Sequence, residues 1–191
     1  SANMDYASII GGFQSCSTPL GARLAGITPT GTMPHALILI LGDTIKAIQA
    51  FDKHIPKEVP RIALVDTFKD EVEESINVAK VMRNKLEGVR LDTPKERGGV
   101  TPDLVKEVRV KLDLSDSHHV QIFVSGGITP DRIREFIKSG AKIDGFGVGS
   151  FITQAKPNDF TADIHQIEGK PIAKRGRLPG ITDNPRLERL L

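Results

Sequence analysis

The sequence has few features of a secreted, membrane or nucleic-acid-binding protein. Its 191 residues include a single cysteine, Cys16, which excludes an internal disulfide and a cysteine-rich zinc site and fits a reducing cytoplasm. The longest strongly apolar run, residues 36–41, is far below the roughly 18 residues of a membrane helix. A formal net charge of +2 provides no strong basic surface for nucleic acid. We therefore expect a soluble, cytoplasmic protein with no membrane or nucleic-acid partner.

Motifs for metal binding are also missing. There is no HxxxH, no CxxC and no aspartate-rich loop with metal-ligand spacing, so we expect no metal site built by the protein alone. The chain starts without an initiator methionine or a leader, and it is shorter than the roughly 250 residues of a closed (β/α)8 barrel. We expect a segment of a longer protein.

Short apolar runs alternate with helical patterns along most of the chain. The strand candidates are residues 12–15, 26–29, 61–65, 88–91, 120–124 and 143–148, and the helical patterns cover about 33–50, 69–86, 101–111 and 129–139. This alternation is typical of an α/β fold with a parallel sheet and helices outside it. The sequence predicts an α/β barrel portion, incomplete in this chain.

Two of the helices have clear start signals. Thr101-Pro102-Asp103 and Thr129-Pro130-Asp131 each combine a capping threonine with proline at the first helical position. The helix over 69–86 has acidic residues in its first turns and basic residues in its last, which matches the helix dipole, and Gly88 is predicted to end it.

The barrel pattern ends near residue 152. Residues 153–191 are predicted to form a β hairpin around Gly169 and a basic, irregular tail, which contains Arg175, Arg177, Arg186 and Arg189. We therefore divide the chain into residues 1–152 and 153–191.

Two glycine clusters follow the last two predicted strands of the barrel pattern. They are Ser125-Gly126-Gly127 and Gly147-Val148-Gly149-Ser150. In barrels of this kind, the loops after the last strands frequently bind phosphate through bare backbone N–H groups and a helix N-terminus. The clusters predict a phosphorylated substrate.

Charged side chains stand at the ends of two other predicted strands. Asp66 follows one of them, while Arg90 and Asp92 alternate along the next and so point to the same side. Carboxylates there can accept hydrogen bonds from sugar hydroxyls or hold a divalent ion, and arginine can grip a carboxylate or phosphate. An ion pair that only closes the barrel interior is the alternative.

His35 begins a long apolar helix after Gly31-Thr32-Met33-Pro34. By itself such a histidine often only packs or caps the helix. Its position at a helix N-terminus, where anions are favoured, is also compatible with phosphate chemistry.

Several segments together resemble the nicotinate phosphoribosyltransferases, which are type II phosphoribosyltransferases. They come in the order Gly11 to Gly21, Gly31 to His35, Val65-Asp66-Thr67, Val89 to Asp92, Ser125 to Ile128 and Phe146 to Gly149. The resemblance covers nearly all residues to about Arg177, and it implies the barrel half of such an enzyme. The C-terminal β segment would then return to an N-terminal α/β sandwich domain that this chain lacks.

The resemblance implies a reaction of nicotinate with 5-phosphoribosyl 1-pyrophosphate, carried with Mg2+, to nicotinate mononucleotide and pyrophosphate in NAD biosynthesis. Some members couple it to ATP hydrolysis, and members assemble as homodimers or higher homo-oligomers.

The resemblance also implies roles for residues. Ser125, Gly126, Gly127, Gly147 and Gly149 would hold the 5′-phosphate, Asp92 the ribose hydroxyls, and Arg90 the substrate carboxylate or the diphosphate. Asp66 would support the ribose or magnesium, and Thr67 would bind substrate. His35 matches the histidine that is phosphorylated in ATP-coupled members.

The sequence departs from the family after Asp92, where many relatives continue Ser-Gly-Asp but this chain has Thr93-Pro94-Lys95-Glu96. A contact to the ligand or loop can therefore differ here. The alternatives are the decarboxylating quinolinate phosphoribosyltransferase, a non-catalytic phosphate-binding barrel, and a sugar-phosphate isomerase or aldolase. The last has no evident Schiff-base lysine at a strand end.

Overall fold

A computed structural model describes residues 2–156 and 161–186 of the chain. The chain divides into two compact units, Ser1–Gln154 and Ala155–Leu191, and each is described by itself. Within the described residues, no helix combines the length and hydropathy that crossing a membrane requires.

The first unit contains a four-stranded parallel sheet in the order β1-β2-β3-β4. The strands are β1 (Ile62–Leu64), β2 (Gly88–Leu91), β3 (Gln121–Val124) and β4 (Gly145–Phe146). Neighbours along the chain are also neighbours in the sheet, and all three pairings are parallel. The predicted α/β fold with a parallel sheet is confirmed, whereas the assignment of this sheet to an incomplete barrel stays a prediction.

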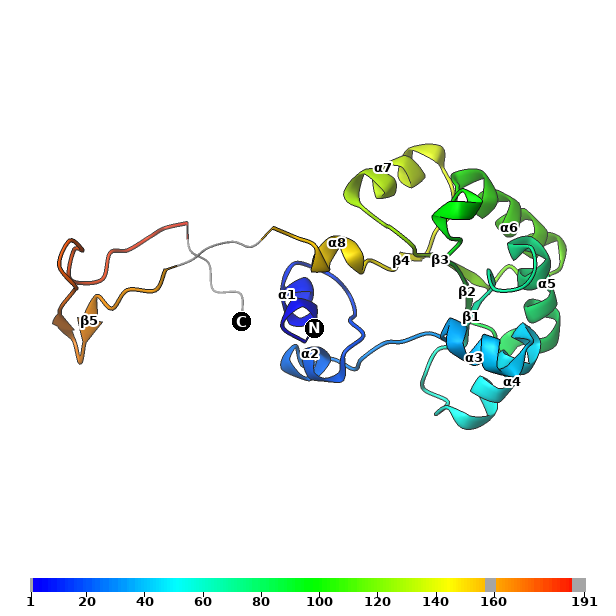
Figure 1. Ribbon diagram of the computed structural model, residues 1–191, viewed down its shortest axis with the longest axis horizontal. Helices are drawn as coiled ribbons and strands as arrows, with labels where there is room; N and C mark the ends of the chain where they lie inside the picture. The colour runs from blue at the N-terminus through cyan, green and yellow to red at the C-terminus, as the bar shows by residue number, and fades with distance from the viewer. Residues whose placement is uncertain (1, 157–160, 187–191) are drawn as a thin grey trace. The chain divides into compact units, whose positions relative to one another are not determined.

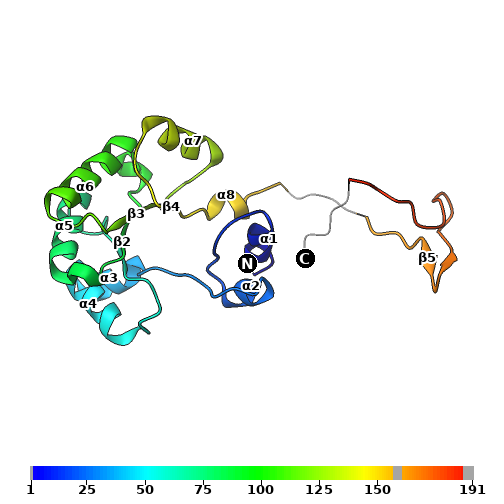
Figure 2. The same cartoon turned by 180° about the vertical axis from the view of Figure 1, so that it is seen from behind.

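A helix follows each of the first three strands and leads to the next. These are α5 (Glu71–Met82), α6 (Pro102–Leu114) and α7 (Pro130–Ser139). Fully buried side chains from the sheet join others from α5 and α6 in one core, among them Val89, Leu91, Ile122, Val124, Val78 and Val105. The helices α5 and α6 lie on one side of the sheet, and α1 and α2 lie on the other (Figures 1 and 2).

Side-chain caps fix where these helices begin. The hydroxyls of Thr101 and Thr129 accept from the N–H groups of Leu104 and Arg132, as predicted. The carboxylate of Asp70 caps α5 in the same way, satisfying donors that the first helical turn leaves open. The capping residue therefore fixes the first turn of each of these helices.

The other face of the sheet carries Arg90 and Phe123, which are register partners on β2 and β3. The ring of Phe123 lies against Gly88 and Gly145, where an added Cβ would come within 2.8 and 2.9 Å of its atoms. Gly88 therefore has a packing role in β2. The prediction that it ends the preceding helix is wrong, because α5 stops at Met82 and is followed by the short η1 (Arg83–Lys85).

The prediction of strands over residues 12–15 and 26–29 is wrong. This part of the chain forms α1 (Ala2–Ile10) and α2 (Pro19–Leu24), joined and followed by irregular segments. The Thr18 hydroxyl accepts from the Gly21 N–H and Pro19 takes the first position of α2, so a local cap decides the structure here.

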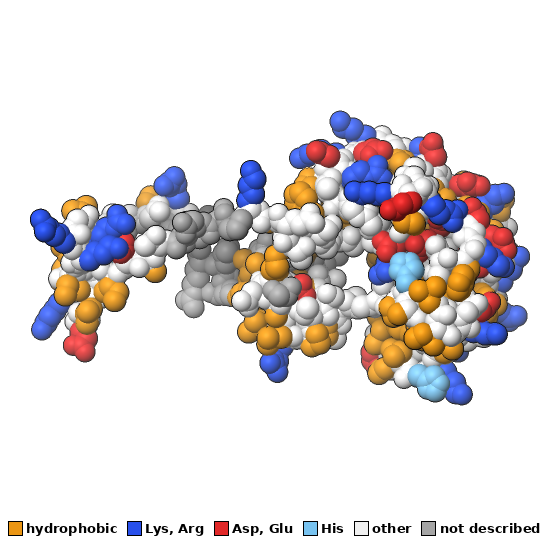
Figure 3. Space-filling view, in the orientation of Figure 1, with side chains coloured by type: hydrophobic (Ala, Val, Ile, Leu, Met, Phe, Trp, Pro, Cys, Tyr) orange, Lys and Arg blue, Asp and Glu red, His pale blue; other side chains and the backbone are white. Residues whose placement is uncertain are grey.

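The single helix predicted over 33–50 is two helices, α3 (His35–Leu41) and α4 (Thr44–His54). Gly42 separates them because its φ of 68° is a left-handed conformation that stops α3, and Asp43 then caps α4. Hydrophobic side chains gather on the surface over α3 and α4 (Figure 3), and Leu39 and Ile40 are exposed. The strand predicted over 143–148 is shorter than expected and leads to α8 (Ser150–Thr153).

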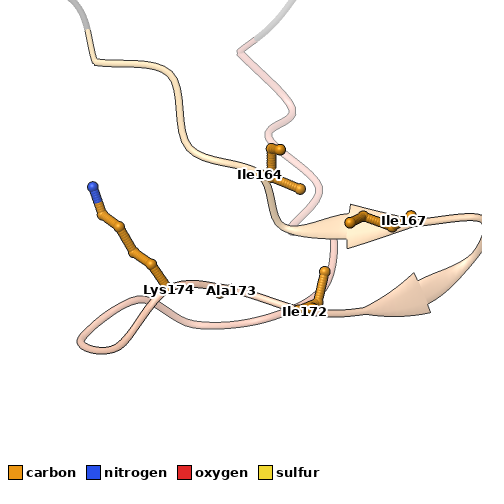
Figure 4. Close-up of a pocket in the computed structure, with 5 residues that line it drawn as sticks. All are labelled: Ile164, Ile167, Ile172, Ala173 and Lys174. Carbon is orange, nitrogen blue, oxygen red and sulfur yellow. The ribbon is translucent and has the colours of Figure 1, made fainter.

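The second unit contains the predicted hairpin, an antiparallel pair of β5 (Gln166–Ile167) and β6 (Lys170–Pro171). Glu168 and Gly169 form its turn with φ values of 46° and 77°. Ile164, Ile167 and Ile172 line a small pocket beside it (Figure 4). Among residues 172–186 no helix or strand follows, and Arg189 of the predicted tail lies outside the described residues.

Candidate functional site

The carboxyl ends of β1, β2 and β3 place three polar residues at one edge of the sheet. Asp66 lies beyond β1, Asp92 follows β2 directly, and Ser125 follows β3. The Ser125 hydroxyl donates to Oδ1 of Asp92 at 2.8 Å, and its N–H donates to the Leu91 carbonyl at 2.9 Å. The structure therefore joins Asp92, a predicted ribose ligand, to the first glycine loop.

Arg90 and Asp92 lie on the same side of β2, as their alternation predicts, with Nη2 3.8 Å from Oδ2. Nη1 of Arg90 donates to the Thr32 hydroxyl at 2.5 Å. Nε of Arg90 is buried and has no hydrogen-bond partner among the described residues. The guanidinium is therefore held in place by Thr32 while part of its donor capacity stays unused.

Thr32 was not singled out by the sequence, although it stands in the Gly31 to His35 segment. Its contact joins residues 58 positions apart. Only the fold brings this hydroxyl to Arg90, so no local pattern could identify it.

His35 and Asp66 form a close pair. Nε2 of His35 lies 3.2 and 3.1 Å from the two carboxylate oxygens of Asp66. The Asp66 side chain is 3% exposed, whereas that of His35 is 39% exposed and reachable from solvent. His35 is the first residue of α3, whose cap position, Pro34, provides no side-chain hydrogen bond.

Burial and the contact with His35 have opposite effects on the pKa of Asp66. Burial raises the pKa of Asp66 above its ordinary value, because a carboxylate loses solvation, and the charge of Asp92 adds to this effect. Contact with His35 opposes it. A buried carboxyl group with a raised pKa at a strand end is typical of functional sites.

The two predicted glycine loops are adjacent. A Cβ on Gly147 would lie 3.0 Å from Cβ of Ser125. Gly126 and Gly127 have φ values of 86° and 64°, which a side chain would strain. Across the described part of the chain, the N–H groups of Gly126, Gly127, Ile128, Val148 and Gly149 have no acceptor. They form a set of unused donors suited to an anion.

Gly147 differs from the other glycines. Its N–H donates to the Val124 carbonyl at 2.9 Å and so belongs to the sheet. Its lack of a side chain is still needed, because of the contact with Ser125. Within this site, Gly147 leaves room for the loop rather than providing a donor.

Thr67 and Thr93 occupy the loops after β1 and β2. The Thr67 hydroxyl is buried without a hydrogen-bond partner in the described residues. The Thr93 hydroxyl donates to Oε1 of Glu71 at 2.8 Å, and both residues are buried. Glu71 therefore ties the start of α5 to the loop after Asp92, a link that the sequence did not indicate.

The described residues contain no group of three or more His, Cys, Asp or Glu side chains placed to hold a metal. Asp66 and Asp92 are nevertheless hard oxygen donors, the kind that Mg2+ takes when substrate phosphates supply the other ligands. The site therefore combines unused N–H donors for an anion, carboxylates for hydroxyl groups or a cation, and an arginine for a second acidic group.

Comparison with known proteins gives a family match. The model of the family "Quinolinate phosphoribosyl transferase, C-terminal domain" matches residues 2–163. Nicotinate phosphoribosyltransferase from Mycobacterium tuberculosis is 32% identical over 151 residues, which are 78% of this chain and 31% of the relative. Nicotinate phosphoribosyltransferase from Bacillus subtilis is 27% identical over 163 residues, covering 84% of this chain and 32% of its own length.

A solved structure is also similar. The crystal structure of nicotinate-nucleotide pyrophosphorylase from Pyrococcus furiosus has a TM-score of 0.78 and 49% identity, covering 93% of this chain and 45% of that one. This chain thus spans less than half of these relatives.

Proposed function

The chain belongs to the family of quinolinate phosphoribosyl transferase C-terminal domains, type II phosphoribosyltransferases, and we propose that it contributes the phosphoribosyl site of a pyridine nucleotide biosynthetic enzyme. One observation carries the proposal. The unused N–H groups of the first glycine loop lie beside Asp92, which Ser125 binds, and the second glycine loop lies against Ser125. A sugar phosphate needs this combination, because donors must face its phosphate and a carboxylate must face its hydroxyls.

We assign the 5′-phosphate of phosphoribosyl pyrophosphate to the loops at Gly126, Gly127 and Gly149. Asp92 then accepts hydrogen bonds from the ribose hydroxyls. Its orientation is fixed by the 2.8 Å hydrogen bond from Ser125, and preorganisation of this kind lowers the cost of binding.

Nicotinate is the acceptor that we propose. Its carboxylate is a suitable partner for Arg90, whose Nε is unused and whose Nη1 is anchored on Thr32. The names of the relatives from M. tuberculosis and B. subtilis agree with nicotinate. His35 provides an exposed imidazole beside Asp66 for phosphorylation by ATP.

The chemistry needs little from the protein beyond placement and charge. Loss of pyrophosphate from the anomeric carbon passes through an oxocarbenium-like state, so the protein has to align the reactants and stabilise positive charge at the sugar. Asp66 and Asp92 provide negative charge at this edge of the sheet. Mg2+, bound with the diphosphate, would neutralise charge on the leaving group, and the same carboxylates are its best ligands among the described residues.

Quinolinate is the second candidate acceptor, because the matching family model is that of quinolinate phosphoribosyl transferases. This reaction also gives nicotinate mononucleotide but releases carbon dioxide. The two candidates therefore differ in a measurable product.

An assay with both acids tests the proposal. The complete protein that carries this sequence is incubated with phosphoribosyl pyrophosphate, Mg2+ and either nicotinate or quinolinate, with and without ATP. We expect nicotinate mononucleotide and pyrophosphate from nicotinate. Carbon dioxide release from quinolinate alone would replace nicotinate by the second candidate, and no mononucleotide from either acid would contradict the proposed function.

The 191 residues assayed alone give a separate test. Since the chain spans 45% of the P. furiosus relative, we expect no turnover without the remaining part. Robust mononucleotide formation by the isolated chain would contradict this expectation.

A further inference from the structure

The loop after β2 brings a lysine to the first glycine loop. A Cβ on Gly127 would lie 3.4 Å from Cε of Lys95 and 4.0 Å from its Nζ. The Lys95 ammonium therefore lies over the backbone of Gly127. Within the described part of the chain, this ammonium has no ion pair and no hydrogen-bond acceptor.

The position of Lys95 is fixed by its own loop. Lys95 begins the short helix η2 (Lys95–Arg97), which ends at Gly98 with a φ of 96°. The N–H of Gly98 donates to the Lys95 carbonyl, and that of Gly99 donates to the Pro94 carbonyl. These hydrogen bonds form a compact turn around the base of the lysine.

A buried hydrogen bond anchors the same loop to the rest of the unit. Thr93, two residues before Lys95, donates to Glu71 at the start of α5, and both residues are buried. The lysine backbone is thus held between a buried anchor and a glycine-terminated turn. The backbone of Lys95 is therefore fixed at a position from which its side chain reaches the unused N–H groups of Gly126 and Gly127.

We propose that Lys95 is an additional substrate-binding residue, whose ammonium binds the phosphate that the Gly126–Gly127 loop holds. The inference rests on the proposed function, because it takes that phosphate to be the 5′-phosphate of the phosphoribosyl group. A dianionic phosphate has more acceptor sites than the glycine N–H groups occupy, and a compact ammonium is a suitable partner for the others.

The test compares ligands with and without the phosphate. Dissociation constants for nicotinate mononucleotide and nicotinate riboside are measured on the complete protein and on Lys95→Gln, Lys95→Arg and Lys111→Gln. Lys111 is an exposed lysine on α6, so its variant removes the same charge elsewhere. Steady-state kinetics on the same proteins separate KM for phosphoribosyl pyrophosphate from kcat.

We expect Lys95→Gln to weaken mononucleotide binding about 5- to 20-fold and to leave riboside binding unchanged, since a partly solvated charged hydrogen bond is lost. KM should rise by a similar factor with little change in kcat. Lys95→Arg should restore most of the affinity, and Lys111→Gln should match the unmodified protein.

Equal weakening of both ligands, or equal affinities in Lys95→Gln and Lys111→Gln, would overturn the assignment of Lys95. So would a failure of arginine to restore binding. If the unmodified protein binds no mononucleotide, the proposed function itself fails, and the inference on Lys95 fails with it.

Discussion

The two ends of the parallel sheet use arginine in opposite ways. At the amino end, Arg61 directly precedes β1, its side chain is 5% exposed, and all five of its N–H donors have partners. Its acceptors are the Asp52 carboxylate and backbone carbonyls of nearby residues. At the carboxyl end, Arg90 has one close acceptor, Thr32, and a buried Nε without a partner among the described residues.

The difference separates groups that hold the fold from groups that await a ligand. A buried arginine with every donor satisfied stabilises the loops around it. One with unused donors costs free energy in the unbound protein, and a bound ligand can recover it. The same division distinguishes the stability face from the functional face in barrels of this type.

Removing the carboxylate at the functional end should have the largest effect. Asp92→Ala is expected to lower kcat/KM of the complete protein by about 10²- to 10³-fold, because ribose loses a preorganised acceptor. The thermal midpoint should change little, since the Asp92 side chain is partly exposed. Activity within about tenfold of the unmodified protein, a loss of only ~1.4 kcal/mol in the barrier, would remove Asp92 from the ribose site.

Substituting the two arginines tests the comparison directly. Arg61→Met should lower the free energy of unfolding by about 3 kcal/mol, because it leaves several backbone carbonyls without partners and Asp52 with Lys85 alone. Arg90→Met should cost less than about 1 kcal/mol of stability but lower kcat/KM by roughly 10²-fold. Chemical denaturation gives the free energy of unfolding of each variant, and steady-state kinetics give its kcat/KM. A reversed pattern would contradict the division between the two ends.

The first glycine loop can be changed by a single methyl group. Gly126→Ala adds a Cβ at a φ of 86° that would lie 3.0 Å from Oδ1 of Asp92. We expect a stability loss of about 1–2 kcal/mol and a roughly tenfold rise in KM for phosphoribosyl pyrophosphate.

Gly140→Ala is the matched control for the glycine loop. Gly140 has a φ of 72° at the end of α7, but no atom lies within 4 Å of an added Cβ. Gly140→Ala should lower the thermal midpoint only by the cost of the backbone conformation. Its KM for phosphoribosyl pyrophosphate should be unchanged. Equal KM values in both variants would mean that Gly126 does not contact the substrate.

The smallest effect concerns Asp66 and pH. Since burial raises the pKa of Asp66 above 3.8, the stability that this group contributes is fully present below pH 3.8 and is lost as pH rises through the folded pKa. Asp66→Asn cannot ionise, so its thermal midpoint should fall less than that of the unmodified protein between pH 4 and pH 7.

For Asp52, stability is expected to change with pH in the opposite direction. Lys85 and Arg61 lower the pKa of Asp52, so its contribution is present above pH 3.8 and is lost as pH falls through the folded pKa. Asp52→Asn should lose stability at pH 7. If the thermal midpoint of Asp66→Asn varied with pH in the same way as that of the unmodified protein, burial would not disfavour the charged form of Asp66.

Much of the fold follows from local signals in the sequence. The apolar runs that became β1, β2 and β3 and the threonine caps of α6 and α7 depend on neighbouring residues, and periodicity and capping describe such neighbours well. The strand predictions over residues 12–15 and 26–29 are wrong, because short glycine-containing runs resemble strands whether or not a partner strand exists. Gly42 broke a helix that the apolar pattern alone would have continued.

The site was predictable as a set of residues and not as a set of contacts. Strand-end positions identified Asp66, Asp92 and Ser125, because the carboxyl ends of parallel strands meet at one edge. The contacts of Arg90 with Thr32, of Asp92 with Ser125 and of Thr93 with Glu71 join residues 58, 33 and 22 positions apart. Such pairs depend on register and loop conformation, which no local pattern encodes.

The most direct test of the proposed site is a structure of the complete protein with nicotinate mononucleotide bound. We predict the 5′-phosphate within hydrogen-bond distance of the N–H groups of Gly126, Gly127 and Gly149, with the ribose hydroxyls on Asp92. A mononucleotide bound elsewhere, with these N–H groups and Asp92 not in contact with it, would contradict the account.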